Sequence, residues 1–145
     1  MTTTVLAWLL TVVLLTIAGL HAYWGFGGKW PGTDQLTLAR KVVGTPGIDR
    51  MPPRAACLLV AVVLLGMGFW PLQTATSAPT SSIHLLVGIV WTIIFLARGI
   101  AGYLQFWRRQ HPEQPFADLD RRLYSPLCLA LGIGFSILVL KGIAT

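Results

Sequence analysis

Charged residues are scarce in this chain. Asp, Glu, Lys and Arg together make up 11% of the 145 residues, whereas an ordinary soluble domain carries roughly 25%. Hydrophobic residues make up 54% of the chain, and the mean hydropathy is +0.69. A soluble domain of this size buries only roughly 70% of its unfolded surface, so it could not hide this much apolar area. The composition therefore argues against a soluble enzyme, a disordered segment or a disulfide scaffold, and it predicts a small integral membrane protein.

Sequence motifs for catalysis or metal binding are absent as well. No pair of His or Cys has metal-ligand spacing, and the HExxH, GxSxG and Walker motifs do not occur. We therefore expect no metal ion and no cofactor. All five Asp and Glu lie outside the apolar runs, which disfavours a carboxylate-coupled transporter and an intramembrane aspartyl protease.

Four apolar runs are present instead. They extend from Val5 to about Trp24, from Ala55 to Leu72, from Ile83 to about Trp107 and from Tyr124 to Leu140. Each is close to the roughly 17 to 25 residues that cross a bilayer, and each must be helical because lipid cannot satisfy free backbone groups. The chain is therefore predicted to be all-α, with a single transmembrane domain over residues 1–145 folded as an integral membrane four-helix bundle.

Basic residues predict the orientation of this bundle. Of the eleven Lys and Arg, five lie between the first and second runs and four between the third and fourth, whereas the loop from Gln73 to Ser82 has no charge. Because positive residues stay on the cytoplasmic side, both basic loops are expected in the cytoplasm and both termini outside. The excess of Lys and Arg then needs no nucleic-acid partner.

A cleaved signal peptide is the alternative reading of the N-terminus, but Met-Thr-Thr-Thr lacks the positive charge of such a peptide, so a retained first span is favoured.

The long loop after the first run is predicted to hold a short amphipathic helix. Thr33-Asp34 offers an N-cap and Gly44 a C-terminal stop, with apolar and basic residues between them. A helix of this kind suits the membrane interface. The second basic loop, from Arg108 to Leu123, mixes both charge signs with two prolines and is expected to be solvated.

Arg98 is the most informative single residue, because it lies about nine residues inside the third run and an intramembrane charge usually marks a functional site. No acid lies in any run, so Arg98 must snorkel to the interface, bind backbone carbonyls, meet a loop carboxylate or bind an anion.

Polar and aromatic residues at the end of the first run and the start of the fourth share the expected depth of Arg98. With Arg98 they form the candidate ligand site: His21, Tyr23, Trp24, Tyr124, Ser125 and Cys128. An Arg fork suits phosphate or carboxylate and His21 is a candidate acid or base, although interfacial anchoring is the simpler reading of the same residues.

Two segments resemble a known family. They are His-Ala-Tyr-Trp-Gly-Phe-Gly-Gly-Lys-Trp-Pro, from His21 to Pro31, and Arg-Arg-Leu-Tyr-Ser-Pro-Leu-Cys, from Arg121 to Cys128. Both are similar to motifs of a bacterial family of short four-span inner-membrane proteins of unknown function. The resemblance covers nearly the whole chain and implies a four-helix bundle, but it implies no activity and nothing for the loop from Gly32 to Arg54. The residues that match the family pattern are His21, Tyr23, Trp24, Gly27, Gly28, Tyr124, Ser125, Pro126 and Cys128.

Three functions stay open at this point. The first is binding of a membrane lipid, an amphiphile or a small hydrophobic anion near the cytoplasmic leaflet, with Arg98 as the counter-ion. The second is a membrane-embedded enzyme on a lipid-like substrate, with His21 as acid or base and Cys128 as a candidate nucleophile. The third is a structural or accessory subunit of a larger membrane complex, so a homo-oligomer or a membrane protein partner also stays open. The expected location is the bacterial inner membrane.

Overall fold

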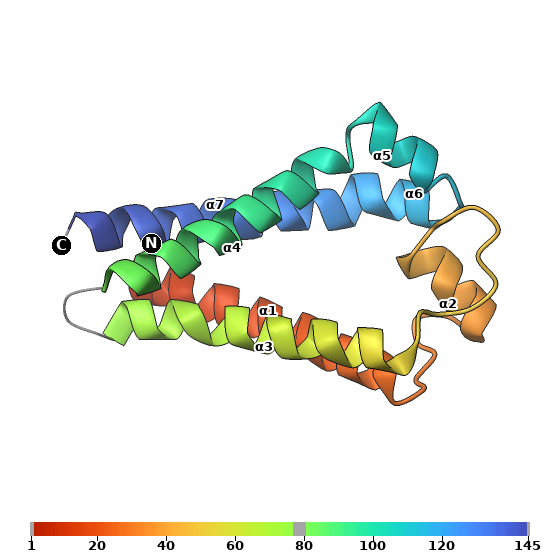
Figure 1. Ribbon diagram of the computed structural model, residues 1–145, viewed down its shortest axis with the longest axis horizontal. Helices are drawn as coiled ribbons and strands as arrows, with labels where there is room; N and C mark the ends of the chain where they lie inside the picture. The colour runs from red at the N-terminus through yellow and green to blue at the C-terminus, as the bar shows by residue number, and fades with distance from the viewer. Residues whose placement is uncertain (1, 77–80, 145) are drawn as a thin grey trace.

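Four long apolar helices dominate the structure, a computed structural model that describes residues 2–76 and 81–144 (Figure 1). They are long and apolar enough to cross a membrane, which confirms the predicted four-span, all-α architecture. Their bounds are α1 Thr3–Gly25, α3 Arg54–Thr76, α4 Ser82–Ala101 and α7 Ser125–Ile143. The short elements are α2 Gln35–Val42, α5 Gln105–Gln110, α6 Phe116–Leu119 and the π-helical turn η1 Asp120–Tyr124, which leads directly into α7.

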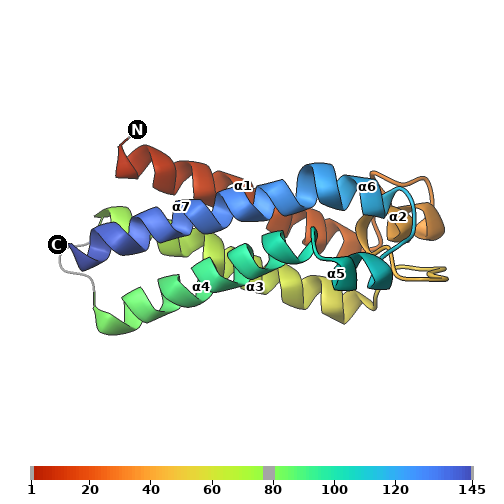
Figure 2. The same cartoon turned by 90° about the horizontal axis from the view of Figure 1, so that it is seen from above.

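The long helices associate as two pairs, α1 with α3 and α4 with α7. Figure 2 shows the molecule from above, with the four long helices aligned roughly along one common axis and alternating in chain direction. Inside the first pair, the buried Thr11 hydroxyl donates a hydrogen bond of 2.8 Å to the Gly68 carbonyl. Inside the second pair, Gly99 allows close approach, since an added Cβ there would lie 2.9 Å from the backbone nitrogen of Leu129. Small residues of this kind permit close helix packing where no hydrophobic effect drives association.

The two pairs meet near the termini and spread apart toward the other end of the molecule (Figure 1). Trp70 of α3 connects them, because its ring stacks on His84 at 4.8 Å and lies 5.5 Å from the Phe135 ring. Its Nε1 also donates to the His84 carbonyl at 3.0 Å. The buried apolar cluster extends from this contact along the inner faces of the pairs: Leu6, Ala7, Leu10, Leu14, Ala18, Leu64, Met67, Trp70, Phe95, Leu131, Phe135, Leu138 and Val139.

Helix α2 lies at the end where the pairs spread apart, here called the basic end because both basic loops gather there (Figure 1). The Asp34 side chain caps α2 by accepting from the Thr37 amide at 2.7 Å, and Gly44 follows the helix with a φ of +71°. The predicted short helix and its two end signals are thus confirmed. The Tyr124 hydroxyl donates to the Lys41 carbonyl at 3.0 Å, which joins α2 to the second pair.

The third apolar run does not form one helix to Trp107 as the sequence analysis predicted. Helix α4 ends at Ala101, and α5 starts a new helix at Gln105. Gly102 lies at the break, where an added Cβ would collide with the Ser125 side chain and lie 2.8 Å from an Asp120 oxygen. This close approach to η1 and α7 leaves no room for a side chain, so the position requires glycine. Arg98 therefore lies in the last turn of α4, nearer the helix end than predicted.

Candidate functional site

Arg98 forms an ion pair with Asp120, which answers the question of its partner. The Arg98 Nη2 atom lies 2.6 Å from Asp120 Oδ1, and the two side chains are 29% and 4% exposed. Helix α4 places the arginine in its last turn and η1 turns the carboxylate toward it. Of the four partners considered for Arg98, the structure thus assigns a loop carboxylate. The segment Arg108 to Leu123 was predicted to be solvated, yet its Asp120 is buried, because it supplies this counter-charge.

The Asp120 carboxylate has two further donors. Trp107 Nε1 donates to Oδ2 at 3.0 Å, and the buried Ser125 hydroxyl donates to Oδ1 at 3.3 Å. The Arg98 guanidinium also lies over the Trp107 ring, 4.6 Å from its centroid, at a distance typical of a cation–π contact. The four residues Arg98, Trp107, Asp120 and Ser125 are called the Asp120 cluster below. The charges of Arg98 and Asp120 are paired within this cluster, whereas the buried Arg98 Nη1 has no hydrogen-bond partner among the described residues. Because Asp120 and Ser125 bind groups at the end of α4, we assign the cluster to the joint between α4 and α7.

The side chains of the remaining predicted site residues make no hydrogen bond to this cluster within the described part of the chain. Tyr124 reaches across to the Lys41 carbonyl and packs against Phe116 at 5.8 Å between ring centroids. Cys128 is half-buried against the apolar cluster. Tyr23 is exposed, and its ring covers Gly28.

His21 and Trp24 lie elsewhere, in a pocket of about 140 Å³ between the end of α1, the end of α2 and the start of α3. Their rings are 4.9 Å apart, and His21 Nδ1 lies 2.9 Å from the Ile17 carbonyl oxygen. Cys57 and Val60 of α3 line the same pocket. The structure therefore divides the predicted single site into separate places: Arg98 and Ser125 in one, and His21 with Trp24 in another.

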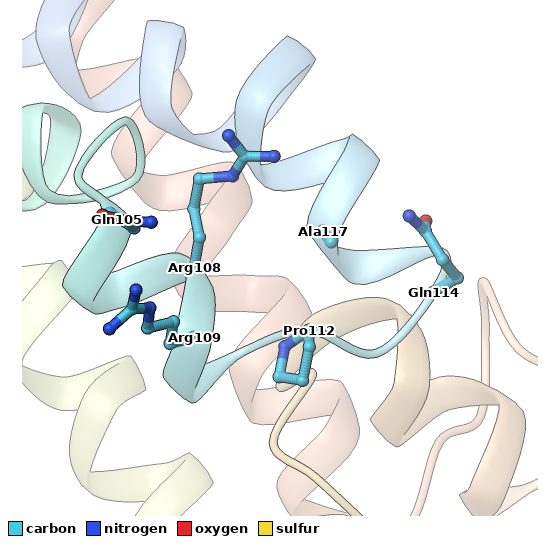
Figure 3. A pocket seen from close by; sticks show the side chains of 6 residues that line it. All are labelled: Gln105, Arg108, Arg109, Pro112, Gln114 and Ala117. Atoms are coloured by element: carbon cyan, nitrogen blue, oxygen red, sulfur yellow. The ribbon is translucent and has the colours of Figure 1, made fainter.

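A second, more open pocket lies between α5 and α6 at the basic end (Figure 3). It has a volume of about 630 Å³ and is lined by Gln105, Arg108, Arg109, Pro112, Gln114 and Ala117. We call it the α5–α6 pocket. Its lining holds two guanidinium groups and two side-chain amides but no carboxylate. Neither Arg108 nor Arg109 has an ion pair or a side-chain hydrogen bond within the part of the chain that the structure describes.

Sequence reasoning missed Asp120, Trp107 and the two pocket arginines. The need of Arg98 for a counter-charge was a usable signal for Asp120, but five acids in the loops competed for that role. Arg108 and Arg109 were counted only as orientation signals, because nothing in the sequence separates a paired arginine from an unpaired one. That distinction required the positions of α5 and α6.

Comparison with known proteins identifies the family of the chain. The family model described as "Protein of unknown function (DUF3995)" matches residues 5–135, which include both motif segments noted in the sequence. No curated protein and no solved structure matches the chain. Because the matched region covers nearly all of the chain, including α1, α3, α4 and most of α7, the protein belongs to the DUF3995 family.

Proposed function

We propose that this protein binds a phosphate-bearing amphiphile, of the class of an anionic phospholipid, in the α5–α6 pocket. The observation that carries the proposal is the pair of unpaired guanidinium groups, Arg108 and Arg109, in an open pocket without a carboxylate. An arginine fork matches the oxygens of a phosphate and can bind it through two hydrogen bonds. The Gln105 and Gln114 amides, which lie on opposite sides of the lining, are further hydrogen-bond donors of this pocket (Figure 3).

The surroundings of the pocket fit the other half of an amphiphile. Phe106 on α5 is 70% exposed and Leu104 just before it is 52% exposed. Both follow directly after a candidate membrane span, so they are suited to lie against acyl chains while the arginines hold the headgroup. Basic pockets at the cytoplasmic side of transmembrane helices are a known mode of lipid headgroup recognition.

The proposal keeps the anion-binding hypothesis from the sequence but moves it away from Arg98. Arg98 already has a carboxylate partner at 2.6 Å, so an incoming anion would have to compete with Asp120. Under the proposal the basic end faces the cytoplasm of a bacterial cell, and the spans lie in the inner membrane, as the distribution of Lys and Arg predicts.

The test is native mass spectrometry of the protein released from membranes that contain phosphatidylglycerol and phosphatidylcholine. We expect the wild type to retain phosphatidylglycerol in preference to phosphatidylcholine, and the Arg108→Gln/Arg109→Gln variant to lose that preference. The matched control is Arg121→Gln/Arg122→Gln, which removes the same charge from exposed arginines outside the pocket lining. Added glycerol phosphate distinguishes a lipid headgroup from a free phosphate ester as the ligand, because a site for the free anion would be saturated by glycerol phosphate.

Equal lipid retention by both double variants would overturn the proposal, since lipid would then respond only to net charge. Loss of retention in the control variant alone would place the headgroup at η1 instead. Retention is expected to fall as salt rises, because the site is open and screened by mobile ions.

A further inference from the structure

The pocket of His21 and Trp24, here called the His21 pocket, is separate from the α5–α6 pocket and has different chemistry. It lies between the first helix pair and α2. Its walls are mainly apolar, with Val42, Met51 and Val60 among the lining residues. Its volume of about 140 Å³ is close to that of an engineered apolar cavity of roughly 150 Å³ that binds benzene. The pocket therefore fits one ring of about six carbon atoms.

His21, a lining residue of this pocket, carries a potential hydrogen-bond acceptor. Its Nδ1 lies 2.9 Å from the Ile17 carbonyl oxygen, and because a carbonyl can only accept, the proton must be on Nδ1. In the neutral ring Nε2 is then an acceptor. No hydrogen bond to this nitrogen occurs within the described residues.

The other polar groups of the pocket are already engaged. The Trp24 indole Nε1 donates to the Trp30 carbonyl at 2.8 Å, and the Cys57 sulfur lies 4.0 Å from the Pro52 carbonyl, at the limit of a thiol hydrogen bond. No lining residue is an acid or a Lys or Arg. A charged ligand would lose its hydration there without a counter-charge, so the ligand that fits is neutral and brings one donor.

We propose that the His21 pocket binds the hydroxyl-bearing aromatic ring of a membrane-soluble molecule, a phenol or a quinol, whose hydroxyl donates to His21 Nε2. The ring would lie beside the Trp24 indole, at a place where a candidate membrane span ends. Its apolar tail would remain in the lipid. The hydroxyl determines which molecules bind, since an ether of the same shape cannot donate a hydrogen bond to His21 Nε2.

The experiment uses the full chain in micelles, labelled with ¹⁵N-histidine, and 4-fluorophenol and 4-fluoroanisole as probes. We expect 4-fluorophenol to shift the Nε2 resonance of His21 upfield, and 4-fluoroanisole to leave it unchanged. Fluorine spectra of the two probes give their affinities, and the phenol should bind about fivefold more tightly, as one net hydrogen bond predicts. His21→Phe assigns the resonance and should abolish this difference.

Matched variants separate the pocket from general partition into micelles. Ala56→Phe fills the pocket from an exposed position and should abolish the response, whereas Ala55→Phe adds the same ring to the neighbouring exposed residue, outside the lining. An equal response to both probes, or a response that survives Ala56→Phe, would overturn the proposal. Binding of fluorobenzoate in place of the phenol would also overturn it, because an anion requires the imidazolium. None of these outcomes depends on Arg108 or Arg109.

Discussion

Asp120 is the residue on which the joint between α4 and α7 depends. Its carboxylate accepts from Arg98, Trp107 and Ser125, and Gly102 approaches it without a side chain. Charge-assisted hydrogen bonds are the strongest of these contacts. Once the carboxylate is neutralised, the guanidinium next to it remains partly desolvated without a partner, which is the costly situation for a charge inside a protein.

The substitution Asp120→Asn is therefore expected to destabilise the protein by about 2 kcal/mol, which is below the usual range for a fully buried pair because Arg98 is 29% exposed. Unfolding in mixed micelles with increasing dodecyl sulfate, followed by circular dichroism, measures the difference. Asp118→Asn is the control, since Asp118 is an exposed acid two residues away and its loss should cost less than about 0.5 kcal/mol. Equal stability of the two variants would contradict the assigned role of Asp120.

At the scale of the element, α2 depends on its first turn. The Thr37 amide, which donates to Asp34, holds the pKa of that carboxyl below its ordinary value, and the Thr37 hydroxyl adds to the effect. Because the folded pKa is lower than the unfolded one, the ionised Asp34 stabilises α2 at pH values above the unfolded pKa. That contribution is lost as the pH falls through the folded pKa.

We expect α2 to fray as the pH falls below the ordinary carboxyl pKa of about 3.9 and through the lowered pKa of Asp34. Hydrogen exchange of the Thr37 amide is the measurement, and its protection should fall with the pH. The variant Asp34→Asn retains a capping side chain but cannot ionise, so its Thr37 amide should show no such titration. Identical pH profiles in the wild type and Asp34→Asn would show that another group controls α2.

The elements differ in how far the sequence could define them. Hydropathy was enough for the four spans and capping chemistry for α2, since both signals are local. The end of α4 was not predictable, because residues 103–107 are nearly as apolar and aromatic as the helix before them, and the contact of Gly102 with Ser125 at the break is between residues far apart in the sequence. The candidate site was harder still. Depth along a span places His21 and Arg98 at similar levels, but only the packing of α1 against α3 and of α4 against α7 shows that they belong to different pairs.

For the whole molecule, the distribution of Lys and Arg makes a testable prediction about orientation. With Cys57 and Cys128 replaced by Ala, the variants Asp49→Cys and Thr2→Cys each carry one exposed thiol at opposite ends of the bundle. A membrane-impermeant maleimide added to intact cells should label Thr2→Cys, and should label Asp49→Cys only after the membrane is opened. Labelling of Asp49→Cys in intact cells would show the opposite orientation, and the α5–α6 pocket would then not face the cytoplasm.

The division into two helix pairs also has a consequence for how the protein is made. Each pair joins long helices that are consecutive in the chain, α1 with α3 and α4 with α7, and most helix contacts form inside a pair. Synthesis begins at the N-terminus and completed units fold as they appear, so the α1–α3 hairpin can assemble in the bilayer while α4 and α7 are still being translated. The contacts through Trp70 and through the Tyr124 hydroxyl form only when the second hairpin arrives. We therefore expect biogenesis to consist of two successive hairpin insertions followed by docking, in which no early span has to wait unpaired for the last one.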